Sequence, residues 1–178
     1  MAVKLDRIGH VNLTVWDVER SKEFYSKLLG FEVVEQDPMH RSGQGVHMAL
    51  PHDGHTLDIG PVTDREHRGS PPRRRERIGV MHVAFKVASY EDLQEAYRTL
   101  LASGIEIDRM TDHVTQRSIY FQDPDGNGLE IYYEYPSAKM ITALERGDRD
   151  FDFTIEDPLP EWATYAGAAA NPGAWRQG

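Results

Sequence analysis

An internal repeat constrains the fold of this chain more than any other feature. When the sequence is shifted by 72 positions, His10-Val11 falls on His82-Val83. The same shift aligns later residues of both segments, in the pairs Val15/Val87, Tyr25/Tyr97, Leu28-Leu29/Leu100-Leu101, Asp53-Gly54/Asp125-Gly126 and Leu57-Asp58-Ile59/Leu129-Glu130-Ile131. Because chance matches do not share one shift from start to end, the chain contains a duplicated module.

Each copy has the pattern of one strand, one helix and three further strands. In the first copy, residues 10–15 alternate apolar and polar, and Asp17 precedes a helical pattern that stops at Gly30. In the second copy, Ser89 is the predicted N-cap of a helix over 90–102, and Gly104 lies just past its end. The other predicted strands lie at about 31–36, 45–50, 56–61, 80–87, 105–109, 117–122 and 128–134.

The predicted domain organisation is a single domain over residues 1–178. Module one covers 5–62, a linker covers 63–78, module two covers 79–135 and a C-terminal tail covers 136–178. The linker is rich in Pro, Arg and Gly, so its arginine cluster is interpreted as part of a solvated loop, with an acidic partner or a neighbouring subunit as the alternative. The tail carries Phe151, Phe153, Trp162 and Trp175, and is expected to pack on the domain or to cover a pocket mouth.

Charge and cysteine content narrow the classes of partner and site. The formal net charge of −9 repels phosphates, so nucleic acid is not an expected partner. The chain has no cysteine, so any metal must be held by histidine, carboxylate or carbonyl groups. No apolar run reaches the ~18 residues that a membrane span needs, and the N-terminal segment does not resemble a signal peptide. A cytoplasmic location and no membrane partner are expected.

The repeat brings potential metal ligands to matching positions. His10 and His82 occupy the same place on the first strand of their modules, and Glu130 lies on the last strand of module two, opposite its repeat partner Asp58. Two imidazoles and one carboxylate with open positions left over suit non-haem Fe(II), although Mn(II) and Zn(II) also bind such ligands. The predicted fold class is therefore α+β, with two tandem βαβββ modules forming a cupped, half-barrel-like mixed sheet around a metal site.

Four segments of the sequence resemble a known superfamily. They read GHVNLTV, FYSKLLGFEVV, MHVAFKV and IYFQDPDGNGLEIYYE, and with the paired modules they cover residues 7 to 135. They are similar to the vicinal oxygen chelate superfamily, which includes glyoxalases, bleomycin resistance proteins and extradiol dioxygenases. Within it the chain most resembles one-domain type I extradiol ring-cleavage dioxygenases, which open a catechol ring beside its two hydroxyls with O₂ and Fe(II).

The resemblance implies specific roles for six residues. Its metal ligands match His10, His82 and Glu130, and the metal is expected to be Fe(II), with Mn(II) as the alternative. Three more positions match the polar residues that assist catalysis in the family, and these are His55, His113 and Tyr120. Each also has a simpler interpretation, as a turn residue, a surface histidine and a core strand aromatic respectively. The remaining histidines, His40, His47, His52 and His67, are assigned no role.

Asp58 leaves the reaction type open. The repeat places it opposite Glu130, which indicates a fourth ligand, whereas extradiol enzymes are expected to have a small residue there. Strand alternation predicts that Asp58 and His55 point to opposite faces unless a bulge intervenes. A metal-bound Asp58 favours a glyoxalase-like isomerase or lyase, and His55 at the metal favours the dioxygenase. A drug-sequestering binding protein is the third possibility.

The expected partners are a small aromatic diol and O₂. A homodimer or higher oligomer is also expected, because exposed sheet edges and an aromatic tail favour association.

Overall fold

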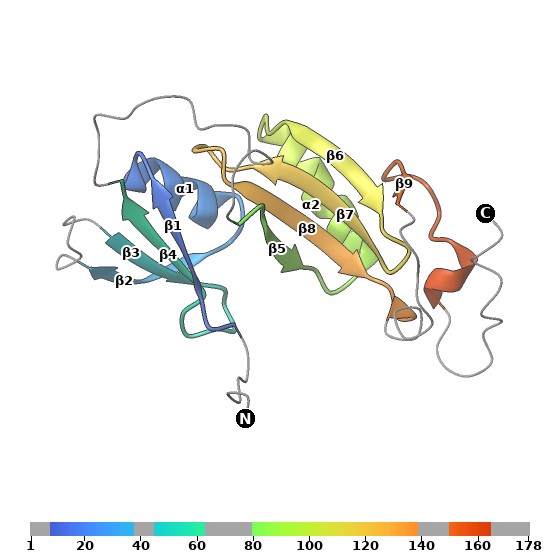
Figure 1. The fold of residues 1–178 in the computed structure, drawn as a ribbon, viewed down its shortest axis with the longest axis horizontal. Coiled ribbons are helices and arrows are strands. Elements are labelled where there is room, and N and C mark those ends of the chain that lie inside the picture. The colour runs from blue at the N-terminus through green and yellow to red at the C-terminus, as the bar shows by residue number, and fades with distance from the viewer. Residues whose placement is uncertain (1–7, 38–44, 63–79, 139–149, 165–178) are drawn as a thin grey trace. The chain divides into compact units, whose positions relative to one another are not determined.

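The computed structural model describes residues 8–37, 45–62, 80–138 and 150–164 (Figure 1). The predicted linker with its arginine cluster, as well as His40, His67 and Trp175, lies outside the described residues. The chain divides into two compact units. The first contains residues 1–79 and the segment 123–127, and the second contains residues 80–122 and 128–178. Within the described ranges, each unit has a mixed sheet and an α-helix, so the predicted α+β class is confirmed.

The first unit holds a four-stranded sheet in the order β1-β4-β3-β2. Strand β1 runs parallel to β4, and the other neighbours are antiparallel. Helix α1 covers one face of this sheet (Figure 1). The elements are β1 (Val11–Val15), α1 (Val18–Lys27), β2 (Glu32–Asp37), β3 (Gly45–Ala49) and β4 (Leu57–Pro61).

The ends of α1 follow from its sequence. The Asp17 carboxylate accepts a hydrogen bond from the backbone N–H of Arg20, which makes it the N-cap. Gly30 adopts a φ of 74° just beyond the helix, a conformation that glycine reaches without steric cost. The buried side of α1 includes Tyr25, which packs edge-on against Phe31. The core of this unit also contains Met48, Leu57 and Ile59.

The second unit repeats this order and adds one strand. Its sheet has the order β5-β8-β7-β6-β9, with β5 parallel to β8. Leu93, Leu100, Ile119, Phe121 and Leu129 are fully buried in its core. The elements are β5 (Val83–Lys86), α2 (Tyr90–Ala102), β6 (Ile107–Asp112), β7 (Gln116–Gln122), β8 (Gly128–Glu134) and β9 (Phe151–Asp152), followed by the 3-10 helix η2 (Glu161–Thr164).

The predicted βαβββ order is confirmed in both units. Helix α2 spans the predicted residues because Ser89 and Asp92 form a reciprocal capping box at its start. Two strand bounds differ by three residues from the prediction: β5 begins at Val83 rather than residue 80, and β6 extends to Asp112 rather than stopping at residue 109. The other bounds agree within two residues. Strand β9 was not predicted. It comes from the tail and pairs with Thr111 and Asp112 at the open edge of β6.

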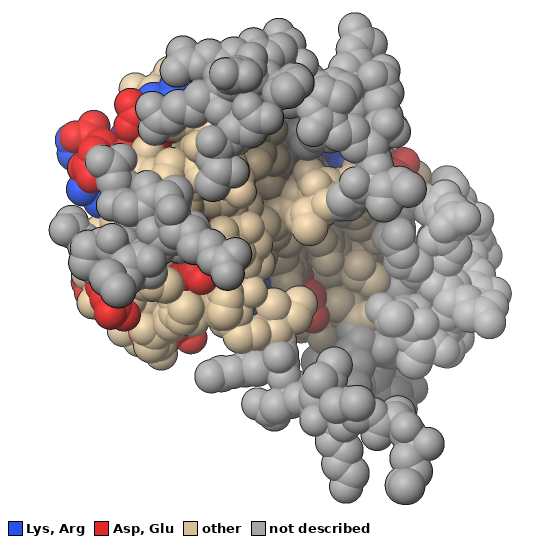
Figure 2. Space-filling model, turned by 60° about the vertical axis from the view of Figure 1, so that its left-hand side comes forward, with Lys and Arg blue, Asp and Glu red and all other residues tan. Residues whose placement is uncertain are grey.

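The described surface carries mixed charge. On the face drawn in Figure 2, basic and acidic side chains lie beside one another at the left edge. On α1, Lys22 pairs with Glu19, and Lys27 pairs with Glu23 at 3.1 Å. Such exposed pairs add only about 0.3–0.5 kcal/mol each, so they mainly keep this surface solvated. None of the described helices is long and apolar enough to cross a membrane.

Candidate functional site

The second unit brings two predicted metal ligands together. His82 lies one residue before β5, and Glu130 lies on β8, the strand that pairs with β5. His82 Nε2 is 2.9 Å from Glu130 Oε2. The other carboxylate oxygen of Glu130 accepts a 3.1 Å hydrogen bond from the amide of Gln116. Glu130 is 3% exposed, and a buried carboxylate requires such partners.

Two predicted catalytic residues lie beside this pair. Tyr120 on β7 sits directly opposite Glu130 in the ladder, and its ring meets the His82 ring edge-on at 5.4 Å. His113 Nε2 is 2.8 Å from the Tyr120 hydroxyl oxygen. Burial, and next the negative charge of Glu130, raise the pKa of Tyr120 above its usual value. The phenol therefore stays protonated at neutral pH and is available as a hydrogen-bond donor.

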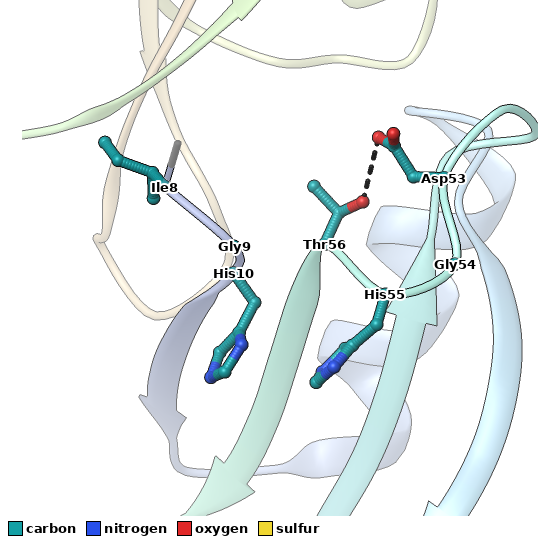
Figure 3. A pocket seen from close by; sticks show the side chains of 7 residues that line it. All are labelled: Ile8, Gly9, His10, Asp53, Gly54, His55 and Thr56. Atoms are coloured by element: carbon teal, nitrogen blue, oxygen red, sulfur yellow. Dashed lines mark hydrogen bonds between the residues drawn. The ribbon is translucent and has the colours of Figure 1, made fainter. Parts of the chain in front are cut away.

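The first unit brings the other two predicted histidines together. The rings of His10 and His55 stack with centroids 4.5 Å apart. Figure 3 shows them side by side, His10 from the segment before β1 and His55 from the loop before β4. They line an open hollow of about 390 Å³, whose wall consists of residues 8–10 and 53–56. A small organic molecule fits a space of this size.

Asp58 joins this histidine pair. Its carboxylate contacts His55 Nε2 and lies 2.5 Å from His47 Nδ1 and 3.4 Å from His10 Nε2. Burial raises the pKa of Asp58, but the hydrogen bonds with His55 and His47 outweigh it and hold this pKa below its usual value. Among the described residues, His10, His55 and Asp58 form a group whose potential ligand atoms all lie within 4.8 Å of one another.

The prediction that Asp58 and His55 point to opposite faces was wrong. Alternation of side chains holds only within a strand, and β4 begins at Leu57. His55 therefore lies in the preceding loop and is free of the strand's alternation, which lets its ring turn toward the carboxylate.

His47 has contacts that the sequence analysis did not foresee. It lies on β3 directly across from Asp58, and besides the carboxylate its Nδ1 is 3.2 Å from His55 Nε2. The one feature of the sequence that could have indicated a role for His47 is its position between the apolar residues Val46 and Met48. By contrast, His52 is exposed in the loop after β3.

Since His10 belongs to the first unit while His82 and Glu130 belong to the second, the joint three-ligand site stays a prediction.

Comparison with known proteins decides the family. Residues 7–131 match the model of the Glyoxalase/Bleomycin resistance protein/Dioxygenase superfamily. The chain belongs to this superfamily. The predicted resemblance is thereby confirmed at the level of the superfamily, and the matched region ends one residue after Glu130.

Individual relatives within the superfamily are distant. The chain is 29% identical over 129 residues to catechol-2,3-dioxygenase of Bacillus subtilis, a match that covers 72% of this chain and 42% of that protein. It is 28% identical over 150 residues to biphenyl-2,3-diol 1,2-dioxygenase 2 of Rhodococcus globerulus, covering 79% of this chain and 70% of that protein. The chain therefore spans less than half of the first of these relatives.

Solved structures of the superfamily share the fold. A glyoxylase/bleomycin resistance protein/dioxygenase domain from Frankia superposes with a TM-score of 0.62 at 23% identity, covering 74% of this chain and 99% of that one. This likeness concerns the fold alone.

Proposed function

We propose that this chain is an extradiol dioxygenase that opens a catechol-type ring with O₂ at an Fe(II) ion held by His10, His82 and Glu130. The observation that carries the proposal is the arrangement in the second unit. Two adjacent donors, His82 and Glu130, have the hydrogen-bonded pair of Tyr120 and His113 beside them. The two relatives whose names specify catechol and biphenyl-diol cleavage support the same reaction class.

The donors are suited to a divalent metal. His82 Nε2 and Glu130 Oε2 lie 2.9 Å apart, close enough for one divalent ion to be held by both residues. The described polar contacts of Glu130 are with His82 and Gln116 rather than with a lysine or arginine, so its buried charge suits a cation. Mn(II) remains the alternative metal, since affinity does not select between the two ions.

The protein's own side chains would handle the protons of the substrate. When bound, Fe(II) supplies adjacent open positions for the diol and for O₂. The Tyr120 hydroxyl would hydrogen-bond a substrate oxygen and help to remove its proton, and His113 would stabilise the negative charge that develops on that oxygen. His55, which is half exposed in the hollow of the first unit, would act as acid or base on the O₂ side.

One assay tests the reaction. The protein is reconstituted anaerobically with Fe(II) and then mixed with a small panel of catechols in air-saturated buffer. The proposal predicts a yellow ring-opened product and O₂ uptake in equal amounts. If protein that holds one metal ion forms no coloured product and takes up no O₂ with any of these catechols, the proposal is wrong.

A second candidate is a metal-dependent isomerase or lyase of the glyoxalase type. It is favoured by the 3.4 Å approach of Asp58 Oδ2 to His10 Nε2, which mirrors the contact of Glu130 with His82. In that case Asp58 would be a fourth ligand, and a carboxylate would move a proton on a carbonyl substrate. Substitution of Asp58 separates the two candidates, because only the isomerase would need it as a ligand.

A further inference from the structure

The tail brings one more carboxylate to His113. Strand β9 pairs antiparallel with β6, so that Asp152 faces Thr111 and Phe151 faces Asp112. The next step of this register places Asp150 opposite His113, and Asp150 Oδ1 is 2.7 Å from His113 Nδ1. Asp150 lies beyond the duplicated modules, where the repeat predicts no functional residue.

Asp150 and Tyr120, on either side of the His113 ring, indicate its tautomer. A carboxylate only accepts hydrogen bonds, so Nδ1 must carry the proton that is donated to Asp150. In the neutral ring Nε2 is then an acceptor, and it receives the hydroxyl hydrogen of Tyr120 at 2.8 Å. Asp150, His113 and Tyr120 thus form a directed chain of two hydrogen bonds that ends beside Glu130.

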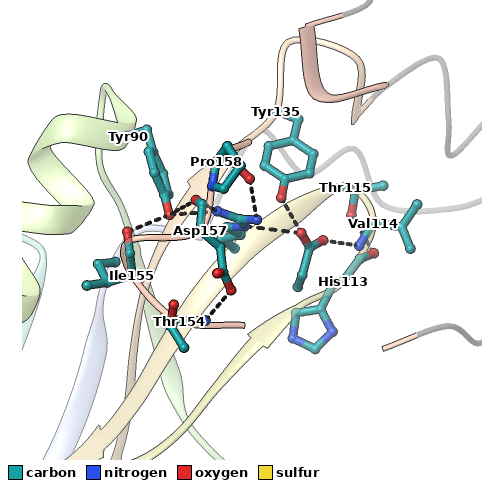
Figure 4. A network of polar contacts seen from close by, with 11 residues as sticks. Tyr90, His113, Val114, Thr115, Tyr135, Thr154, Ile155, Asp157 and Pro158 are labelled. Atoms are coloured by element: carbon teal, nitrogen blue, oxygen red, sulfur yellow. Dashed lines mark hydrogen bonds and ion pairs between the residues drawn. The ribbon is translucent and has the colours of Figure 1, made fainter. Parts of the chain in front are cut away.

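A buried arginine fixes the segment that follows Asp150. Arg117 is 4% exposed and donates to the backbone carbonyls of Asp157 and Pro158 at 2.7 and 2.9 Å (Figure 4). The Tyr90 hydroxyl donates to the carbonyl of Ile155 at 3.1 Å. These bonds hold residues 155–158 to the sheet. Asp150 is itself exposed, and it adjoins β9, which pairs with β6.

The turn that carries His113 is also held in one conformation. Val114 has a φ of 68°, which is rare for a β-branched residue and costs of order 1–3 kcal/mol. The Asp112 carboxylate accepts a 2.8 Å hydrogen bond from the Val114 backbone N–H, and it also pairs with Arg117 at 3.2 Å. Arg117 therefore contacts both the tail, at residues 157–158, and the Asp112 carboxylate that holds the turn of His113.

We propose that Asp150 is a positioning residue for the reaction, holding His113 in the Nδ1–H tautomer so that its Nε2 accepts the proton that Tyr120 passes on. This inference rests on the proposed function. As the substrate hydroxyl gives its proton to the Tyr120 oxygen, the Tyr120 hydrogen moves to His113 Nε2. The resulting imidazolium is paired with the Asp150 carboxylate. One proton leaves the substrate, one arrives at His113, and Tyr120 ends as it began.

The tautomer can be measured without any substrate. The full chain, labelled with ¹⁵N-histidine and loaded with diamagnetic Zn(II), is studied by NMR near pH 8, well above the ordinary pKa of histidine. The His113 signals are assigned by their loss in His113→Gln. We expect Nδ1 to carry the hydrogen in the wild type, and Asp150→Ala to move a large share of the ring to the Nε2–H form. A wild-type ring with its hydrogen on Nε2, or unchanged ring signals in Asp150→Ala, overturns the proposal.

The kinetic part uses matched variants of the Fe(II) enzyme. Asp150→Ala is expected to lower kcat by roughly tenfold or more with little change in KM or metal content. Asp150→Glu should recover much of the rate. The control is Asp152→Asn, an exposed aspartate two residues further along in β9, which should match the wild type. An unchanged kcat in Asp150→Ala refutes the catalytic role. If the wild type cleaves no catechol, the proposed function fails, while the ring signals still decide whether Asp150 sets the tautomer.

Discussion

Tyr120 and Glu130 face each other across the ladder of β7 and β8. Because cross-strand partners project to the same side of a sheet, the phenol and the carboxylate share one surface. His82 approaches that surface from the start of β5, and His113 approaches it from the turn before β7. Two histidines, a tyrosine and a glutamate therefore gather on one unit, although they are spread over residues 82–130.

Loss of the buried carboxylate should remove the metal. Glu130→Ala takes away one oxygen donor and leaves His82 without its 2.9 Å partner, so metal content and turnover should fall together. His82→Ala should have the same effect. Elemental analysis after reconstitution and desalting measures the metal. The matched control is Glu134→Ala, a partly exposed glutamate of the same strand paired with Lys86, which should keep the metal. Full metal content in Glu130→Ala would remove Glu130 from the ligand set.

Loss of the Tyr120 hydroxyl should slow the reaction and leave the metal in place. Tyr120→Phe keeps the ring that meets His82 but removes the donor to His113. We expect turnover to fall by roughly tenfold or more, because the loss of a general acid or base typically has an effect of at least this size. Steady-state kinetics with a catechol measures the change. Tyr133→Phe is the control, because alternation places Tyr133 on the other face of β8. Equal rates for the two variants would mean that Tyr120 is only a packing residue.

Substitution of Asp58 separates the two candidate reactions. If Asp58 only orients His55, Asp58→Ala should retain one metal ion per chain and still cleave catechols, at a reduced rate because His55 loses its contact with the carboxylate. His55→Ala should likewise retain the metal. Metal content and O₂ uptake are the measurements. Loss of the metal in Asp58→Ala, with no O₂ uptake by the wild type, would favour the isomerase.

Tyr25 should make folding stability sensitive to alkali. Burial and the nearby Asp123, which accepts its hydroxyl hydrogen at 2.9 Å, raise the pKa of Tyr25 far above its usual value. Above about pH 10 the unfolded tyrosine ionises while the folded one stays protonated. The free energy of unfolding is therefore unaffected below pH 10 and falls above it, by about 1.4 kcal/mol per pH unit for each such tyrosine.

Tyr25→Phe should flatten that alkaline decline. It removes one ionisable group and one hydrogen bond worth about 1 kcal/mol, so the variant is less stable near pH 8 but loses less between pH 10 and 11. Denaturant unfolding at several pH values measures both effects. The pKa of Tyr135 is raised in the same way by burial and Asp112. In the variant, Tyr135 therefore still contributes part of the decline of the free energy of unfolding with pH. If the free energy of unfolding falls equally with pH in the wild type and the variant, Tyr25 is not the source of the alkaline decline.

The sequence predicted the repeated elements well because their signals are local. The caps at Asp17 and Ser89, and the glycines at positions 30 and 104, set helix bounds through contacts within a few residues. The six site residues were chosen from the repeat and from the superfamily resemblance. The structure brings four of them together in the second unit and two in the first.

The missed contacts depend on pairing between distant segments. Strand β9 is two residues long and carries no alternation, so only the open edge of β6 defines it. Asp150 and His47 acquire their partners through strand register, which a single sequence does not reveal. The predicted relation of His55 to Asp58 failed because strand alternation was extended to a residue outside the strand: His55 lies in the loop before β4.

The most direct test of the account is to follow the atoms of O₂ into the product. The Fe(II)-loaded protein turns over a catechol under O₂ enriched in the heavy oxygen isotope, and mass spectrometry measures the label in the organic product. Extradiol cleavage predicts a ring-opened acid that contains both atoms of the labelled O₂. A product that retains the aromatic ring or contains no label, formed by protein that holds its metal, would contradict it.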